Sequence, residues 1–293
     1  MRPRLFLLSA AALSSAVHVA GVLTARPIWR YAEVLSIVLL LACAMVSRSP
    51  GPRWAIGVGL TVLLVHAART VPEARDSGGG GWKVLVPGSG FDTPSAFESG
   101  LSLCWPSLTA VLGLLIAWRR GGWRLPTAVP AVAGALLVIG YAVVRIVGTG
   151  RAVAAEPSRA SGTGVADVMM AVGMAALPPL VLGITALALA SALAGHRRRL
   201  ASLGAALLAL MALLLIDACV ATVPMPLYVG DAYAVFAWDA ITPTLSMPQP
   251  MPALTAAVEL TAYLLLVAGL TNSHGPASVG NGGWRTRRVG LPE

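Results

Sequence analysis

The stretch RRRLASLGAALLALMALLLIDACVATV, residues 197–223, decides the fold class of this protein. Three arginines precede a long apolar run in which Asp217 is the only charged side chain. A bilayer core about 30 Å thick requires about 20 apolar helical residues for each crossing. Because the basic residues stop where the apolar run begins, the stretch predicts a transmembrane helix that starts at one membrane surface.

Seven other apolar runs repeat this pattern along the 293 residues. With 57% hydrophobic residues, 11% charged residues and a mean hydropathy of +0.78, the composition excludes a water-soluble domain. We therefore predict an all-α, polytopic membrane protein with eight transmembrane helices. The eight predicted spans are 5–24, 31–47, 54–69, 101–118, 126–147, 165–194, 200–223 and 253–271.

The charged residues are divided unequally between the two ends of these spans. One set of ends holds 13 of the 21 Lys and Arg residues and 1 of the 12 Asp and Glu residues, a formal charge of +12. The other set holds the remaining 8 basic and 11 acidic residues, a charge of −3, and together they give the net +9. Since cytoplasmic loops are enriched in Lys and Arg, we predict a multi-pass plasma-membrane protein with both termini in the cytoplasm.

The same distribution bears on the partners of the chain. Basic residues gathered at span ends indicate membrane topology, so we expect the lipid bilayer as a partner and no nucleic acid. The outer connections then cover residues 25–30, 70–100, 148–164 and 224–252, and three of the four are long. Long surface loops often carry function. If the chain has a protein partner, we expect it to be another membrane protein or an extracytoplasmic protein that docks on these loops.

The alternation of short and long connections predicts four helical hairpins in two halves. The first half is residues 1–120, with the long outer loop 70–100, and the second is residues 121–272, with the outer loop 224–252. Residues 273–293 form a basic cytoplasmic tail that we predict to be disordered.

Matching tripeptides suggest an internal duplication. The second and sixth predicted spans open with AEV at 32–34 and ADV at 166–168, and the third and seventh end with TVP at 70–72 and 222–224. These matches motivate the hypothesis of a 4+4 parallel repeat, as found in many transporters. The alternative is coincidence in a chain rich in Ala and Val.

Three segments have a local interpretation of their own. Residues 77–81 are rich in Gly and predict a hinge, and residues 228–239 interleave aromatic residues with Asp, which predicts a short interfacial or re-entrant helix. Residues 1–25 loosely resemble a secretory signal, but their apolar run is longer than a signal core, so we expect a retained helix, with cleavage as the alternative.

Charged side chains inside a membrane are candidates for function, because they need a partner or water. His18, Asp217 and Glu259 lie deepest, each about six residues or roughly 9 Å below the outer boundary of its span. Asp217 and Glu259 occupy sequential spans, so their carboxylates could share a proton or bind a cation, or Arg145 could neutralise one of them. The alternative is a buried ion pair or hydrogen bond that fixes the register of the helices.

The remaining polar candidates are closer to the outer boundary. Arg145 is expected within about one turn of that boundary, where snorkelling lowers the cost of its charge. We rank it with His18, Asp217 and Glu259 as a candidate ligand-binding or ion-binding residue. The secondary candidates, for which a structural role is the alternative, are Glu33, His66, Arg69 and Asp167.

Two further features have both a functional and a packing interpretation. Pro178 and Pro179 interrupt the sixth span and predict a helix break or a kinked helix. Thioether and imidazole groups at similar depth could bind Cu(I), although methionine is also an ordinary packing residue, and neither a metal nor a cofactor is assigned. The side chains considered for copper are Met169, Met170, Met174, Met225, Met247, Met251, His18 and His66.

The sequence contains no motif of a soluble enzyme: there is no HExxH, no Walker A and no GxSxG. No catalytic residue is assigned. The leading hypothesis is a transporter-like protein with an outward-facing polar cavity for a small solute, a proton or a cation. The alternatives are a non-catalytic membrane subunit or assembly partner that docks another protein through its outer loops, and a membrane enzyme that uses Asp217 or Glu259 as a general base at the outer leaflet.

Overall fold

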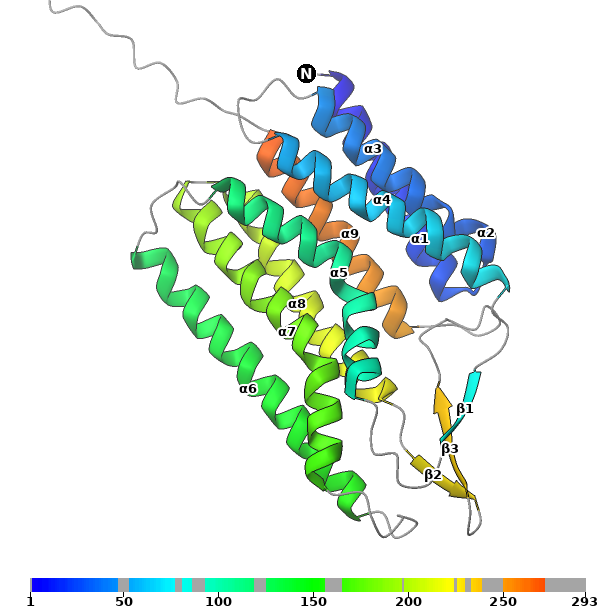
Figure 1. The fold of residues 1–293 in the computed structure, drawn as a ribbon. Coiled ribbons are helices and arrows are strands. Elements are labelled where there is room, and N and C mark those ends of the chain that lie inside the picture. The colour runs from blue at the N-terminus through cyan, green and yellow to red at the C-terminus, as the bar shows by residue number, and fades with distance from the viewer. Residues whose placement is uncertain are drawn as a thin grey trace, which may run out of the picture.

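The computed structural model consists of nine helices and three short strands within the residues that it describes (Figure 1). The helices are α1 (Arg2–Leu23), α2 (Pro27–Arg30), α3 (Ala32–Val46), α4 (Arg53–Asp76), α5 (Thr93–Trp118), α6 (Leu125–Ala155), α7 (Val165–Gly195), α8 (Arg199–Thr222) and α9 (Pro250–Thr271). The strands are β1 (Gly81–Leu85), β2 (Pro226–Val229) and β3 (Tyr233–Trp238). The described residues are 2–46, 53–76, 81–85, 93–118, 125–155, 165–196, 198–223, 226–229, 233–238 and 250–271.

The chain is an integral membrane protein by the length and composition of its helices. Seven of the described helices are long and apolar enough to cross a membrane, namely α1, α3, α5, α6, α7, α8 and α9, where the span at α3 starts at Ile28 in α2. The remaining predicted span, 54–69, corresponds to α4, which is apolar over the shorter stretch Trp54–Thr70. The predicted class, a helical multi-pass membrane protein, is confirmed at this level.

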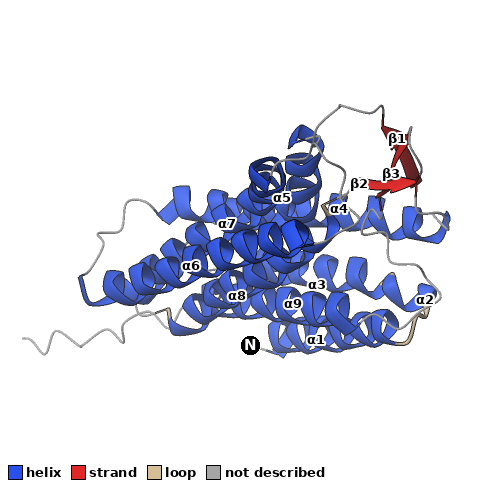
Figure 2. Ribbon diagram, turned by 90° about the horizontal axis from the view of Figure 1, so that it is seen from below, coloured by secondary structure: helices blue, strands red, loops and turns tan. Residues whose placement is uncertain are grey.

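The long helices lie side by side in one bundle (Figures 1 and 2). Helix α7 packs against α5, α6 and α8, and α8 in turn packs against α9. Helix α1 contacts α3 and α9, α3 contacts α4, and α4 contacts α5. Helix α6 lies at the edge of the bundle, where its contacts are with α7 and, to a smaller extent, α8.

Helix α7 continues through Pro178 and Pro179, so the alternative of a helix break is excluded and the kinked helix stays a prediction. A proline has no N–H, and Pro179 therefore leaves the carbonyl of Ala175 without its helical donor. Helix α5 passes so close that a Cβ atom on Gly100 would collide with this carbonyl oxygen. Gly100 thus allows the backbones of α5 and α7 to approach each other at the Ala175 carbonyl, which lacks its helical donor. This arrangement suits a weak Cα–H···O contact to that carbonyl oxygen.

The strands form a small antiparallel sheet in the order β1-β3-β2 beside one end of the bundle (Figure 2). We call this the sheet end; α4 and α8 finish there and α9 begins there. The prediction of a short helix over 228–239 is wrong, because the alternating YAVFAW of β3 pairs with a strand that is distant in sequence. Aromatic and β-branched residues favour a strand when such a partner is available. Residues 77–80 of the predicted hinge, and the tail 273–293, lie outside the described residues.

Candidate functional site

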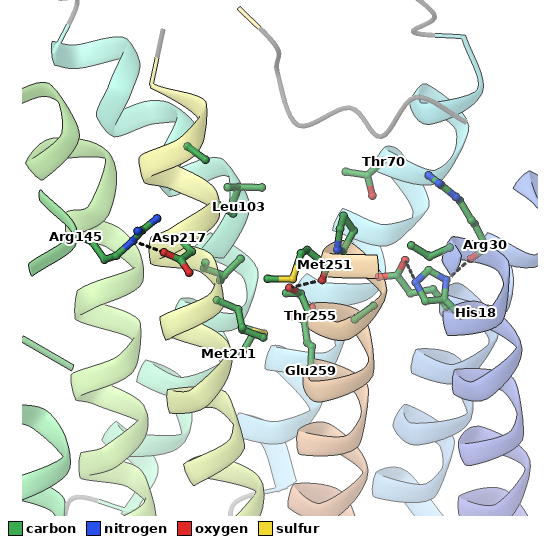
Figure 3. A pocket seen from close by; sticks show the side chains of 18 residues that line it. His18, Arg30, Thr70, Leu103, Arg145, Met211, Asp217, Met251, Thr255 and Glu259 are labelled. Atoms are coloured by element: carbon green, nitrogen blue, oxygen red, sulfur yellow. Dashed lines mark hydrogen bonds and ion pairs between the residues drawn. The ribbon is translucent and has the colours of Figure 1, made fainter. Parts of the chain in front are cut away.

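A cavity of about 580 Å³ lies between the helices (Figure 3). It lies toward the sheet end, since its lining includes the last turns of α8 and the first turns of α9. Every described helix except α7 contributes a lining side chain. All four primary candidates of the sequence, His18, Asp217, Glu259 and Arg145, line this one cavity, and so does the secondary candidate Glu33. In the view of Figure 3, Arg145 and Asp217 lie on one side, His18 and Arg30 lie on the other, and Glu259 lies between them.

The other secondary candidates do not line the cavity. His66 makes an edge-to-face contact with Trp105, with ring centroids 5.7 Å apart. Arg69 is exposed near the end of α4, and Asp167 is half-buried in the first turn of α7.

Asp217 on α8 is held by two partners on α6. Its Oδ1 forms an ion pair with Nε of Arg145, and its Oδ2 accepts a hydrogen bond of 2.7 Å from the Tyr141 hydroxyl. The predicted span ended at residue 147, whereas α6 continues to Ala155, so Arg145 lies well before the end of its helix; its depth in the membrane stays a prediction. Gly148 and Gly150 lie within α6 and do not end it, since glycine is only a weak signal of a helix end when the helix packs against a neighbour. The charge of Arg145 is therefore deeper in its helix and is neutralised by a carboxylate.

Glu259 on α9 is held by hydroxyl groups. Its Oε1 accepts a hydrogen bond of 2.6 Å from Ser107 of α5, whose Oγ in turn accepts one of 3.0 Å from the Tyr263 hydroxyl. Ser107 and Tyr263 are buried. The sequence analysis did not identify either residue, because a hydroxyl in an apolar helix does not by itself indicate a site.

His18 on α1 lies between a carbonyl and a carboxylate. Its Nδ1 is 3.1 Å from the carbonyl oxygen of Arg30, and its Nε2 is 3.7 Å from Oε2 of Glu33. Since a carbonyl can only accept, Nδ1 must be the protonated nitrogen, and a neutral ring would then turn a lone pair on Nε2 toward the carboxylate. The contact between Nε2 and the Glu33 carboxyl is favourable when one more proton is present, either on Nε2 or on that carboxyl group. The geometry of the pair is thus compatible with one additional proton.

The connection between α1 and α3 places Arg30 at the cavity. The Arg26 N–H donates to the Gly21 carbonyl at 2.8 Å and the Ala25 N–H to the Val22 carbonyl at 3.4 Å, which is the hydrogen-bond pattern of a Schellman motif. Ala25 takes the left-handed conformation that ends the helix, with φ of 55°. The chain then turns back at once into α2, whose last residue is Arg30.

Arg30 is only 5% exposed, and its Nε and Nη2 have no hydrogen-bond partner. The sequence analysis missed this residue because it placed 25–30 in an outer loop, where an arginine needs no explanation. Glu33, three residues further along, attracts the guanidinium electrostatically without forming an ion pair with it. A buried guanidinium with free donors is a natural site for an anionic group.

The described residues contain no group of three or more His, Cys, Asp or Glu side chains that could hold a metal ion. Of the methionines considered for copper, Met251 lines the cavity, Met225 and Met247 lie outside the described residues, and the three on α7 do not reach the cavity.

Comparisons of the chain with models of protein families, with curated proteins and with solved structures give no match. The cavity geometry is therefore the basis for a functional assignment.

Proposed function

We propose that this chain is a transporter-like membrane protein that binds a small solute in the cavity between its helices. The observation that carries the proposal is the convergence of five charged side chains, from α2, α3, α6, α8 and α9, on one cavity within a bundle of apolar helices. A charge at membrane depth costs several kcal/mol unless it is paired or wetted, so such charges are retained mainly where they serve a function. A passive structural bundle would need no cavity at that level.

The His18–Glu33 pair supports a coupled proton. It faces the same cavity, and its favourable state contains one proton more than a neutral imidazole beside a carboxylate. Loading and release of that proton would give the solute site two electrostatic states.

We also propose an orientation for the bundle. The start of α1 and the end of α9 lie together, and Nη1 of Arg4 is 3.4 Å from the carbonyl oxygen of Thr271. If the basic ends face the cytoplasm of a plasma membrane, both termini are cytoplasmic, and the cavity and the sheet face outward. The pairs α1/α3, α4/α5, α6/α7 and α8/α9 would then be the four hairpins. The 4+4 repeat stays a prediction. A repeat would make the α5–α7 contact equivalent to the α9–α3 contact, whereas α5 packs closely on α7 and α9 touches α3 only slightly.

The test is uptake into proteoliposomes. Vesicles with the wild type and protein-free vesicles are incubated with a mixture of small metabolites, the contents are identified by mass spectrometry, and proton movement is followed with an internal pH-sensitive dye. We expect protein-dependent uptake of a solute, and Glu259→Gln should slow it by about tenfold or more because the carboxylate lines the cavity. Glu98→Gln, an exposed carboxylate outside the cavity, is the matched control. If neither solute nor protons move with the wild type, the proposal is wrong.

A second candidate function is an assembly partner, and the sheet is the observation that favours it. The strands β1 and β2 are the two edge strands of a sheet that stands beside the bundle. Edge strands offer unpaired backbone groups to another chain. This function requires that replacement of 226–238 by a Gly/Ser linker abolish co-purification of a stable partner while the helices remain folded. The hypothesis of a membrane enzyme stays a prediction.

A further inference from the structure

The charged side chains of the cavity include one ion pair and one histidine–carboxylate pair, and they leave one further charged side chain of each sign. Arg145 is paired with Asp217, and Glu33 faces His18. This leaves the guanidinium of Arg30 and the carboxylate of Glu259, neither of which forms an ion pair with another described residue.

Arg30 presents free donors in a buried position. The residue is only 5% exposed and lines the cavity, and two of its guanidinium nitrogens, Nε and Nη2, lack a hydrogen-bond acceptor. Leaving such donors unsatisfied is expensive, so a planar acceptor such as a carboxylate or phosphate would be strongly favoured there.

Glu259 presents the opposite charge to the same space. Ser107 donates to Oε1 and the Tyr263 hydroxyl donates to Ser107, so the carboxyl group has neutral donors and no counter-charge among the described residues. A primary ammonium group fits this carboxylate, because it supplies the missing counter-charge and several donors.

We infer that the cavity recognises a zwitterion, a small molecule with one anionic group for Arg30 and one cationic group for Glu259. This inference rests on the proposed function and names the chemical class of its substrate. An anion alone would satisfy Arg30 but would enter a cavity that contains three carboxylates. A cation alone would leave the buried guanidinium unpaired. Only a molecule that carries both charges satisfies both residues.

The rest of the lining specifies the part of the ligand between the two charges. A volume of about 580 Å³ is in the usual range of small-molecule sites. Apolar side chains such as Leu103, Met211 and Leu214 make up much of the wall. A zwitterion with an apolar body is therefore favoured over a compact, fully polar one.

The test uses the full chain in detergent and ω-amino acids from glycine to 8-aminooctanoate as probes, because the chain length sets the separation of the two charges. For each length, the corresponding carboxylate and the corresponding amine are measured alone. Ligand-dependent shifts of the unfolding midpoint, followed by tryptophan fluorescence, give an apparent Kd. We expect at least one ω-amino acid to bind more tightly than both of its single-charge counterparts.

The variants assign the two charges. Arg30→Gln and Glu259→Gln should each weaken zwitterion binding by about tenfold or more. Arg26→Gln, an exposed arginine on the same connection, and Glu98→Gln should not change it. Arg30→Gln should leave the unfolding midpoint unchanged or raise it, since it removes a buried unpaired charge, so a loss of binding would not reflect misfolding. Arg30→Lys should retain part of the binding.

Nanodiscs distinguish a soluble ligand from a lipid headgroup. If the occupant is the headgroup of a zwitterionic lipid, phosphatidylethanolamine should weaken binding of the ω-amino acid relative to discs of phosphatidylglycerol alone. If the occupant is a soluble solute, the two disc compositions should give the same Kd. Either result agrees with recognition of a zwitterion.

The inference is overturned if a carboxylate or an amine alone binds as tightly as the ω-amino acid, if Arg30→Gln leaves binding intact, or if neither the probes nor phosphatidylethanolamine bind. Zwitterion binding without uptake in proteoliposomes would refute transport and leave this inference standing. Uptake of a solute that lacks one of the two charges would support transport and refute this inference.

Discussion

Neutralising Asp217 and neutralising Glu259 are expected to change the stability of the protein in opposite directions. Asp217→Asn removes the partner of Arg145 and leaves a guanidinium uncompensated inside the bundle. Glu259→Gln removes a carboxylate that has no counter-charge, and an amide oxygen can still accept the hydrogen bond from Ser107. The two changes are chemically alike, and only the surroundings differ.

The magnitude for Asp217→Asn follows from the exposure of the pair. The side chains of Arg145 and Asp217 are 43% and 33% exposed, so the pair lies between a surface ion pair, about 0.2–1 kcal/mol, and a buried one, about 3–5 kcal/mol when broken. The Tyr141 hydroxyl can still donate to an asparagine oxygen. We therefore expect a loss of about 1.5 kcal/mol for Asp217→Asn, and a change between zero and a gain of about 1 kcal/mol for Glu259→Gln.

The assay is thermal unfolding of the purified variants in one detergent, with Arg145→Gln and the Arg145→Gln, Asp217→Asn double variant to complete a cycle. A loss of about 1.5 kcal/mol corresponds to a fall in Tm of roughly 2–3 °C in a chain of this size. The cycle should give a favourable coupling of about 1 kcal/mol between the two residues. The reasoning is refuted if Glu259→Gln lowers Tm as much as Asp217→Asn does, or if the coupling is zero.

Two further changes test the packing. Gly269→Ala should lower stability by about 1–3 kcal/mol, because the new Cβ would collide with the backbone of α8, whereas Gly140→Ala on the exposed face of α6 should raise it by up to about 1 kcal/mol. Ser107→Ala should cost about 1–3 kcal/mol, since the buried Tyr263 hydroxyl loses its acceptor, and Ser102→Ala on the same helix should be neutral. Thermal unfolding measures both pairs; equal effects within a pair would contradict the packing that we describe.

The polar cavity could be anticipated only in part from the sequence. His18, Asp217 and Glu259 stand out because each is a lone polar group within an apolar run, and their distances from the span ends give a common depth. Their partners could not be foreseen, because a helical span does not specify the side from which a neighbour approaches. The contact of Asp217 with α6, rather than with α9, follows from the packing of α6 beside α7 and α8.

Arg30 illustrates what local sequence does not contain. As a residue of a connection it looked solvated, but the Schellman turn at Ala25 directs the chain into α2, where the side chain is enclosed. The strands also depart from the sequence prediction, since β3 pairs with β1, whose residues lie 149–157 positions earlier. Pairing over such a separation has no signature in either segment alone.

The sequence by itself determined the membrane class, the approximate spans and the residues whose charge is anomalous, because transfer of a helix into a bilayer depends on composition summed along about 20 residues. The tertiary structure alone decided which charges compensate one another and which remain unpaired. An ion pair requires its nitrogen and oxygen atoms to lie within about 4 Å, so it depends on the rotation and approach of neighbouring helices. For that reason the unpaired Arg30 and Glu259, on which the proposed ligand chemistry rests, are a property of the fold.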